Sequence, residues 1–254
     1  MNYLSVCSIL RREELYSHEW VTHLLNQGVS RLYLYDNSVP GEPDQRAPLR
    51  EFDKYITWHK APGRPRQRWA SNHAINTYRK QTEFLMFIDL DEFPYSKKHP
   101  RLVETLPEYF KDPKVDALAV HWLNFNSNGH EEYSPEPVVK RFTKRPFEVN
   151  PHVKSICKLA NTIRQGNDVH SYRVKGKIID ENFRELPKDY ALSEPATADV
   201  LALAHFVTKS RQECLVRRSM PRCDTGVMRE PGFFEHHNEG DYEDTYLRDL
   251  IYGK

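Results

Sequence analysis

The sequence is poor in glycine and cysteine, carries almost no net charge, and contains no long apolar run. Ten of its 254 residues are glycine, which is few for a protein built around a glycine-rich dinucleotide-binding loop. The formal net charge of +1 argues against a general nucleic-acid-binding protein, because such proteins usually carry a basic excess. No apolar run approaches the roughly 20 residues that cross a bilayer, so we expect no membrane span.

The four cysteines lie far apart and form no C-x-x-C pair. This spacing disfavours a zinc site or a disulfide framework and fits a reducing compartment. The first six residues show neither the basic region nor the cleavage site of a signal peptide. We therefore expect a soluble protein, either cytoplasmic or of viral or bacterial origin.

The first half of the chain alternates predicted strands and helices. Strands are predicted at 4–10, 31–35, 55–59, 84–88 and 117–125, and helices at 13–26 and 67–81. In the first helix, Leu15, Trp20 and Leu24 belong to one apolar stripe, and Gly28 stands where a C-cap glycine belongs. The alternation predicts an α/β fold with a mixed, mostly parallel central sheet flanked by helices.

The second half is less regular, because four prolines crowd residues 135–151. Strands are predicted at 153–159, 169–174 and 200–205, and helices at 210–218 and 242–252, with Ser210 as an N-cap. We find no internal repeat. We predict one domain over residues 1–254, with an α/β half at 1–125 and a less regular half at 126–254.

Polar side chains follow the predicted strands at their carboxyl ends. Arg11 and Arg12 follow the first strand, and Asp36 and Asn37 follow the second. Parallel strands end at one edge of a sheet, where ligands of open α/β sheets bind. Asp-Asn-Ser is also ordinary turn chemistry, so both interpretations of Asp36 and Asn37 stay open.

The segment 88–93, I-D-L-D-E-F, carries the strongest functional signal. In an extended chain, Asp89 and Asp91 point to the same side. Two carboxylates held this close repel each other unless a cation lies beside them, and Mg²⁺ or Mn²⁺ is the natural partner of oxygen ligands. D-x-D also occurs in solvated loops, but its place directly after a buried strand favours a metal site.

His205 ends the predicted strand at 200–205, and Lys209 follows four residues later at a helix start. This pair suits a diphosphate and metal site. A lone histidine at a strand end is more often structural, so that alternative also stays open.

These segments together resemble a GT-A-type glycosyltransferase of the glycosyltransferase 2-like group, close to family 92. The resemblance covers most of the chain, and D-x-D-E-F at 89–93 and H-x-x-x-K-S at 205–210 are its most specific parts. It also includes the opening residues 6–13, the segment 35–38, and Gln67 with residues 72–74.

The resemblance implies a nucleoside-diphosphate sugar donor bound by residues 1–125, with residues 126–254 on the acceptor side and completing the metal site. It implies Mn²⁺ or Mg²⁺ as the cofactor. The implied metal ligands are Asp89, Asp91 and His205, with His170 as a weaker candidate. The implied donor-binding residues are Arg11, Arg12, Asp36, Asn37, Gln67, Asp89 and Lys209.

Relatives in this group invert the anomeric centre, so one carboxylate should deprotonate the acceptor hydroxyl. At most one of four candidates serves as this base, and each is otherwise a solvated side chain: Asp224, Glu230, Asp241 and Asp244. Trp122 and Phe125 are candidates to stack on the sugar of a glycan or glycoconjugate acceptor, and core packing explains them equally well.

Other functions make different demands on the sequence. A haloacid-dehalogenase-like phosphatase carries D-x-D on its first strand, with Thr or Val where this chain has Phe93. A nicotinamide-linked dehydrogenase needs G-x-G-x-x-G after the first strand, where this chain has I-L-R-R. A non-catalytic sugar-nucleotide or glycan-binding module on the same fold stays open, because only turnover separates it from an enzyme.

Overall fold

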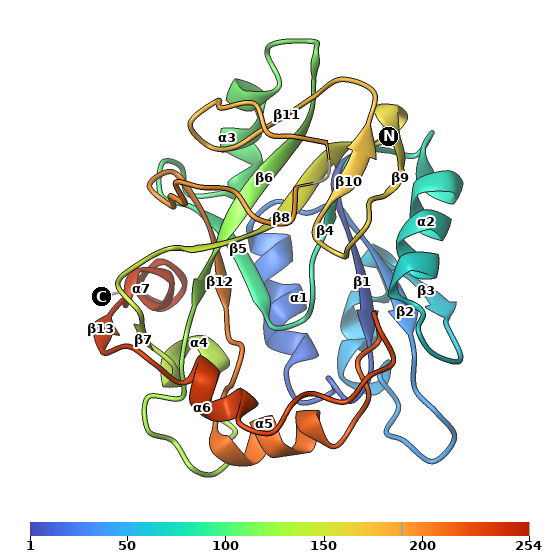
Figure 1. Ribbon diagram of the computed structural model, residues 1–254. Helices are drawn as coiled ribbons and strands as arrows, with labels where there is room; N and C mark the ends of the chain where they lie inside the picture. The colour runs from blue at the N-terminus through green and yellow to red at the C-terminus, as the bar shows by residue number, and fades with distance from the viewer. Residues whose placement is uncertain (189, 254) are drawn as a thin grey trace.

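A computed structural model describes residues 1–188 and 190–253. Across these residues the main sheet has nine strands, in the order β3-β2-β1-β4-β8-β6-β12-β5, with β11 beside β6 (Figure 1). The strands are β1 (Asn2–Leu10), β2 (Arg31–Asp36), β3 (Ile56–Lys60), β4 (Thr82–Phe87), β5 (Glu92–Ser96), β6 (Val115–Asn124), β8 (Asn150–Lys158), β11 (Lys177–Ile179) and β12 (Leu201–His205).

Most strands of this sheet run in one direction. The neighbours β3, β2, β1 and β4 are parallel, and β6 is parallel to both β12 and β11. Only β8, between β4 and β6, and β5, beside β12, run antiparallel to their neighbours in this described sheet. The predicted mixed, mostly parallel α/β sheet is confirmed, and the irregular second half contributes β8, β11 and β12 to it.

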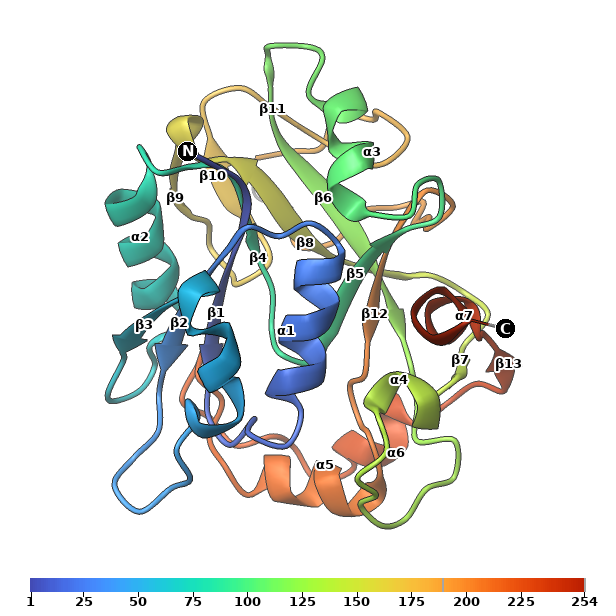
Figure 2. The ribbon, with the colours of Figure 1, turned by 180° about the vertical axis from the view of Figure 1, so that it is seen from behind.

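Helices cover both faces of the sheet (Figures 1 and 2). Helices α1 (Ser17–Asn26) and α3 (Leu102–Tyr109) pack on one face, and α2 (Gln67–Tyr78) packs on the other with the hairpin β9–β10. The smaller elements are η1 (Ala47–Tyr55), α4 (Val138–Arg141), β7 (Lys144–Arg145), η2 (Leu159–Asn161), β9 (Thr162–Gln165), β10 (Tyr172–Val174), α5 (Arg211–Arg218), α6 (Phe233–His237), β13 (Tyr242–Glu243) and α7 (Tyr246–Tyr252).

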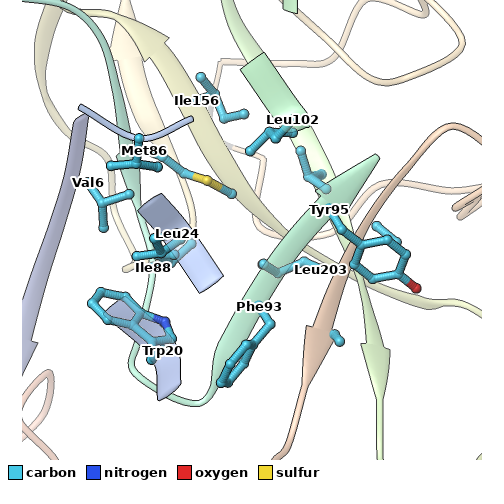
Figure 3. Packing of buried hydrophobic residues seen from close by; sticks show 14 of the residues in the cluster. Val6, Trp20, Leu24, Met86, Ile88, Phe93, Tyr95, Leu102, Ile156 and Leu203 are labelled. Carbon is cyan, nitrogen blue, oxygen red and sulfur yellow. The ribbon is translucent and has the colours of Figure 1, made fainter. Parts of the chain in front are cut away.

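The two faces of β1 enter two separate cores. Leu4 and Val6 belong to the core under α1 and α3, whereas Cys7 and Ile9 belong to the core under α2. This follows from the period of two in a strand, which sends successive side chains to opposite faces. Figure 3 shows the first core, where Trp20 lies with the aliphatic side chains of the sheet.

Several predicted boundaries are wrong. Helix α1 begins at Ser17 rather than at residue 13, so Leu15 lies outside it and is 58% exposed. Strand β10 begins at Tyr172 rather than at residue 169, and the predicted helix at 242–252 divides into β13 and α7. Strand β5 was not predicted. Pro94 lies inside it, and proline is tolerated in a strand chiefly at a sheet edge, which β5 forms.

Two predicted helix caps are confirmed. Gly28 has φ +89°, and its N–H donates to the carbonyl of Leu25 at 3.0 Å, as in a C-capping turn. Ser210 caps α5 in a capping box, in which its side chain accepts from the Glu213 N–H and the Glu213 carboxylate accepts from the Ser210 N–H.

Residues 211–237, which we call the covering segment, comprise α5, a loop and α6. They lie across the carboxyl ends of the strands (Figures 1 and 2). In the part of the chain that the structure describes, no helix has the length and apolar character needed to cross a bilayer.

Candidate active site

A cleft of about 310 Å³ lies between the carboxyl edge of the sheet and the covering segment. The sheet side and its loops contribute Arg11, Glu13, Asn37, Arg64, Gln67, Asp89, Trp122, His152, His170 and His205, and the covering segment contributes Arg217, Arg222, Cys223, Asp224, Arg229, Phe233 and His237. The predicted meeting of strand ends at one edge therefore produces a real cavity.

The D-x-D segment forms a turn between β4 and β5 rather than an extended chain. The Glu92 N–H donates to the carbonyl of Asp89 at 3.1 Å, which closes the turn. The sequence-based expectation that the two aspartates lie as alternate residues of a strand is therefore wrong. Each carboxylate instead contacts a different cation of the chain.

Asp89 faces the cleft and is paired with a lysine from β8. Its Oδ2 accepts from Lys154 Nζ at 2.8 Å, and its Oδ1 accepts from Gln67 Nε2 at 3.2 Å. The Lys154 side chain is 2% exposed, and Glu92 lies 3.4 Å from the same ammonium. Burial raises the pKa of Glu92, and Asp89 and Asp91 raise it further, against the opposing effect of Lys154.

Asp91 is buried beneath the cleft, with a side chain only 1% exposed. Its Oδ2 forms an ion pair with Arg217 and lies 3.5 Å from His205 Nε2, whereas its Oδ1 has no hydrogen-bond partner among the described residues. Burial alone would raise the pKa of Asp91, but its cationic neighbours, Arg217 above all, outweigh this effect and hold that pKa well below its usual value. Asp91 is therefore an anion at neutral pH.

Three histidines surround Trp122 at the cleft wall. The ring centroids of His205, His170 and His152 lie 4.3, 5.0 and 5.1 Å from that of Trp122. His205 Nδ1 shares a hydrogen bond with Asn124 Oδ1 at 3.0 Å, which leaves Nε2 toward Asp91. Burial lowers the pKa of His205, and it lowers that of His170 to about 3, so neutral rings that can act as ligands are favoured.

The donor set for a divalent ion fits in part. No group of three or more His, Cys, Asp and Glu side chains that could hold a metal occurs among the described residues. Mg²⁺ in phosphate-transferring sites, however, is usually held by one or two carboxylates together with substrate phosphates. Asp91, with its free Oδ1, and the adjacent His205 fit such a site. Asp89 is held by Lys154, and His170 Nδ1 contacts the Val153 carbonyl at 3.1 Å.

The two arginines after β1 share one partner. Arg11 and Arg12 donate to Glu42 at 2.6 and 2.9 Å, and only Arg11 belongs to the cleft wall that the structure describes. The single carboxylate of Glu42 therefore balances one of these two positive charges.

Asp36 and Asn37 mainly hold neighbouring loops together. Asp36 accepts from Lys60 Nζ at 2.5 Å and from the Ser38 N–H at 2.9 Å. Asn37 lines the cleft, donates to the carbonyls of Ala61 and Gly63, and accepts from Arg64. The turn chemistry left open by the sequence is thus present.

Lys209 and Phe125 do not belong to the cleft wall that the structure describes. Lys209 is buried, and its Nζ lies 4.4 Å from the ring centroid of Tyr16. Phe125 is 2% exposed and stacks on Phe206 at 5.1 Å, so it is a core residue, whereas Trp122 reaches the cleft.

Of the four base candidates, Asp224 lines the cleft. Burial raises its pKa, but hydrogen bonds from Arg222, at 2.5 and 2.9 Å, outweigh that effect and lower it. Glu230 and Asp241 are exposed and are not among the cleft-lining residues that the structure describes. Asp244 also lies apart from this wall, because it pairs with Arg145 at 2.8 Å.

Sequence reasoning assigned no role to Lys154, Arg217 or Arg229. Lys154 and Arg217 pair with Asp89 and Asp91, and Arg229 lines the cleft. No local pattern marks these three residues, because their contacts depend on the tertiary fold. Glu13, which follows Arg11 and Arg12 after the first strand, also lines the cleft. Burial raises the pKa of Glu13, against the opposing charges of Lys209 and Arg217.

The architecture and the cleft define an α/β protein with an acidic turn and an arginine-rich cover at the carboxyl edge of its sheet. Residues 4–179 match the family model described as glycosyltransferase family 92. The chain therefore belongs to glycosyltransferase family 92, which confirms the resemblance noted from the sequence.

Known family 92 proteins from plants are similar to this chain over part of their length. One from Oryza sativa subsp. japonica is 24% identical over 173 residues, which cover 68% of this chain and 30% of that protein. One from Ricinus communis is 29% identical over 97 residues, which cover 38% of this chain and 17% of that protein. One from Arabidopsis thaliana is 22% identical over 181 residues, which cover 68% of this chain and 32% of that protein. The chain spans about a third or less of the length of these relatives.

Solved structures with a partial likeness include S. aureus TarS, with 14% identity, a TM-score of 0.39, and coverage of 82% of this chain and 37% of that chain. A shorter TarS, residues 1–349, in complex with UDP-GlcNAc has 13% identity and a TM-score of 0.36, and the match covers 63% of this chain and 46% of that chain.

Proposed function

We propose that this chain transfers a sugar from a nucleoside-diphosphate sugar to a hydroxyl group of a glycan or glycoconjugate, with inversion and with the help of Mn²⁺ or Mg²⁺. Membership of family 92 supports transferase chemistry. The observation that carries the proposal is the buried, ionised Asp91 beside His205, beneath a cleft at the carboxyl edge of the sheet.

The side chains of the D-x-D turn have separate tasks in this proposal. Asp91 and His205 would hold the divalent ion together with donor oxygens, and the ion would neutralise charge on the leaving diphosphate. Asp89, oriented by Lys154 and Gln67, faces the cleft and accepts from a donor hydroxyl. The fixed partners keep both carboxylates in place before the donor arrives, which lowers the reorganisation needed for catalysis.

The acceptor side is assigned to the wall around Trp122 and to Asp224. Trp122 offers an aromatic surface within the cleft, and Asp224 is the base candidate that lines it. A carboxylate paired with Arg222 is a weak base, so release from that arginine would precede proton removal from the acceptor hydroxyl.

The decisive experiment measures sugar-nucleotide hydrolysis and transfer with and without Mn²⁺, using a panel of nucleotide sugars. Asp91→Ala should lower metal-dependent turnover roughly a thousandfold, about 4 kcal/mol in the barrier. Asp91→Asn keeps the shape of this buried side chain, and it should lose turnover in the same way while its circular dichroism spectrum stays that of the wild type.

Glu104→Ala is the matched control, because its carboxylate pairs with Arg101 on the surface. Near wild-type turnover in both Asp91 variants would refute the assignment. Binding of a nucleotide sugar by the wild type without any turnover would favour the non-catalytic binding module instead. Family membership already counts against the D-x-D phosphatase.

A further inference from the structure

The covering segment brings arginines to the cleft from residues that are remote from the D-x-D turn. Arg217, in the last turn of α5, pairs with Asp91. Arg229 follows in the loop before α6 and also lines the cleft. Its Nη1 lies 3.4 Å from the carbonyl of Arg217, so the two residues are neighbours.

These two arginines differ in their partners. Arg217 forms an ion pair with the buried carboxylate of Asp91. Arg229 forms no ion pair among the described residues, and it donates to the Arg217 carbonyl. Arg229 is half-buried. Burial and the adjacent positive charge of Arg217 lower the pKa of Arg229 to about 10, which still leaves it charged at neutral pH. A half-buried guanidinium without a carboxylate partner has a large unused capacity for an anion.

Other cations of the cleft are already neutralised or hydrogen bonded. Arg222 pairs with Asp224, so its charge is balanced within the chain, whereas Arg11 shares the single carboxylate of Glu42 with Arg12. Arg64 donates to the Asn37 side chain at 3.2 Å. Among the cleft-lining arginines of the covering segment, Arg229 is therefore the one without a carboxylate partner in the described residues, and it lies next to the ion pair between Arg217 and Asp91.

We propose that Arg229, with Arg217 beside it, forms the diphosphate-binding site of the covering segment. The guanidinium group offers paired N–H donors that match phosphate oxygens. The ligand class is a nucleoside diphosphate, and this inference rests on the proposed function. It goes beyond that function because it assigns affinity for the diphosphate to the chain's own arginines, including affinity that persists without a divalent ion.

The test uses inorganic pyrophosphate as the probe, because the nucleoside is not specified by these contacts. Its binding is measured by titration calorimetry in EDTA and again in Mn²⁺, at low and at high salt. Arg229→Gln should weaken pyrophosphate binding in EDTA at least tenfold and reduce its salt dependence, since screened charge attraction is lost. Arg229→Lys should recover part of the affinity. Arg229 forms no ion pair that the substitution could break, so the melting temperature of the Arg229→Gln protein should stay within about 2 °C of that of the wild type.

Arg101→Gln serves as the control, because this arginine pairs with Glu104 on the surface before α3. Equal pyrophosphate affinity of Arg229→Gln and the wild type overturns the inference. So does a wild type that turns over a nucleotide sugar but binds no pyrophosphate in EDTA, and in that case the proposed function stands. A wild type that neither binds nor turns over any nucleotide sugar refutes the proposed function, and the inference falls with it.

Discussion

The anchor of the covering segment is a buried ion pair, and Glu213→Ala should remove it. Glu213 Oε2 accepts from Arg141 Nη1 at 2.8 Å, and its Oε1 accepts from Nη2 at 3.0 Å, so the pair is bidentate. The two side chains are 1% and 4% exposed. The same carboxylate also accepts from the Tyr16 hydroxyl at 2.8 Å and completes the capping box of α5.

The expected loss of unfolding free energy is about 4 kcal/mol. Breaking a buried pair by removing one partner costs roughly 3–5 kcal/mol, because the remaining charge, here that of Arg141, stays buried without compensation. The helix cap adds about 1 kcal/mol, but the two effects share one carboxylate and do not sum fully.

The pH dependence of this effect has a definite sign. Burial raises the pKa of Glu213, but hydrogen bonds from Arg141, Ser210 and Tyr16 outweigh it and lower the pKa from 4.5 to about 2. A carboxylate with a lowered folded-state pKa stabilises the protein above the unfolded-state value and loses that effect as pH falls toward the folded-state value. The difference in stability between wild type and Glu213→Ala should therefore shrink between pH 4.5 and 2.

Urea unfolding at several pH values measures both effects. Glu104→Ala, which breaks the exposed pair with Arg101, should change stability by less than about 1 kcal/mol. Replacing both partners by apolar residues, Arg141→Met with Glu213→Leu, should recover much of the loss. A Glu213→Ala protein within about 1 kcal/mol of the wild type at neutral pH would refute the reasoning.

Three further changes test other parts of the molecule. His205→Ala should raise the Mn²⁺ concentration for half-maximal turnover roughly tenfold or more, and an unchanged metal titration would leave His205 a structural residue. Gly28→Ala should destabilise by about 1–3 kcal/mol in thermal unfolding, since φ is +89° and a Cβ would lie 2.3 Å from Val103 Cγ2. Lys154→Met should cost about 3–5 kcal/mol in urea because its partner Glu92 stays buried, whereas Lys177→Met, at an exposed pair, should cost under about 1 kcal/mol; equal losses would contradict this.

The fold class could be predicted because its signals are local. Strand β4 is a buried apolar run, and the alternation of strand and helix in the first half requires parallel neighbours. Gly28 and Ser210 were recognised because caps depend on a few adjacent residues. Strand β5 was missed because its place at the sheet edge, where Pro94 is tolerated, depends on pairing with β12, more than 100 residues later.

The candidate site was likewise predictable only where its signals are local. Arg11, Asn37, Asp89 and His205 were found because each stands at or just after the carboxyl end of a strand, and the structure brings all four to one cleft. The conformation of the D-x-D segment was mispredicted as extended, since the reversal into β5 is set by tertiary pairing.

The sequence predicted the acidic residues of the candidate site but not the cations that pair with them. A carboxylate as buried as Asp91 cannot stay ionised without a nearby cation. The burial of this aspartate therefore already requires a cationic partner. The sequence cannot say which cation it is, because Arg217 lies 126 residues away and has no local feature that distinguishes it from other arginines on exposed helices. A divalent ion and a guanidinium meet the same requirement, and a diphosphate can bind both, because its oxygens coordinate metal ions and accept hydrogen bonds from guanidinium groups. The free protein therefore uses the cation that folding supplies. Under the proposed function, a divalent ion would compete with Arg217 for Asp91, and metal binding would be favoured when Arg217 turns to the donor's phosphates.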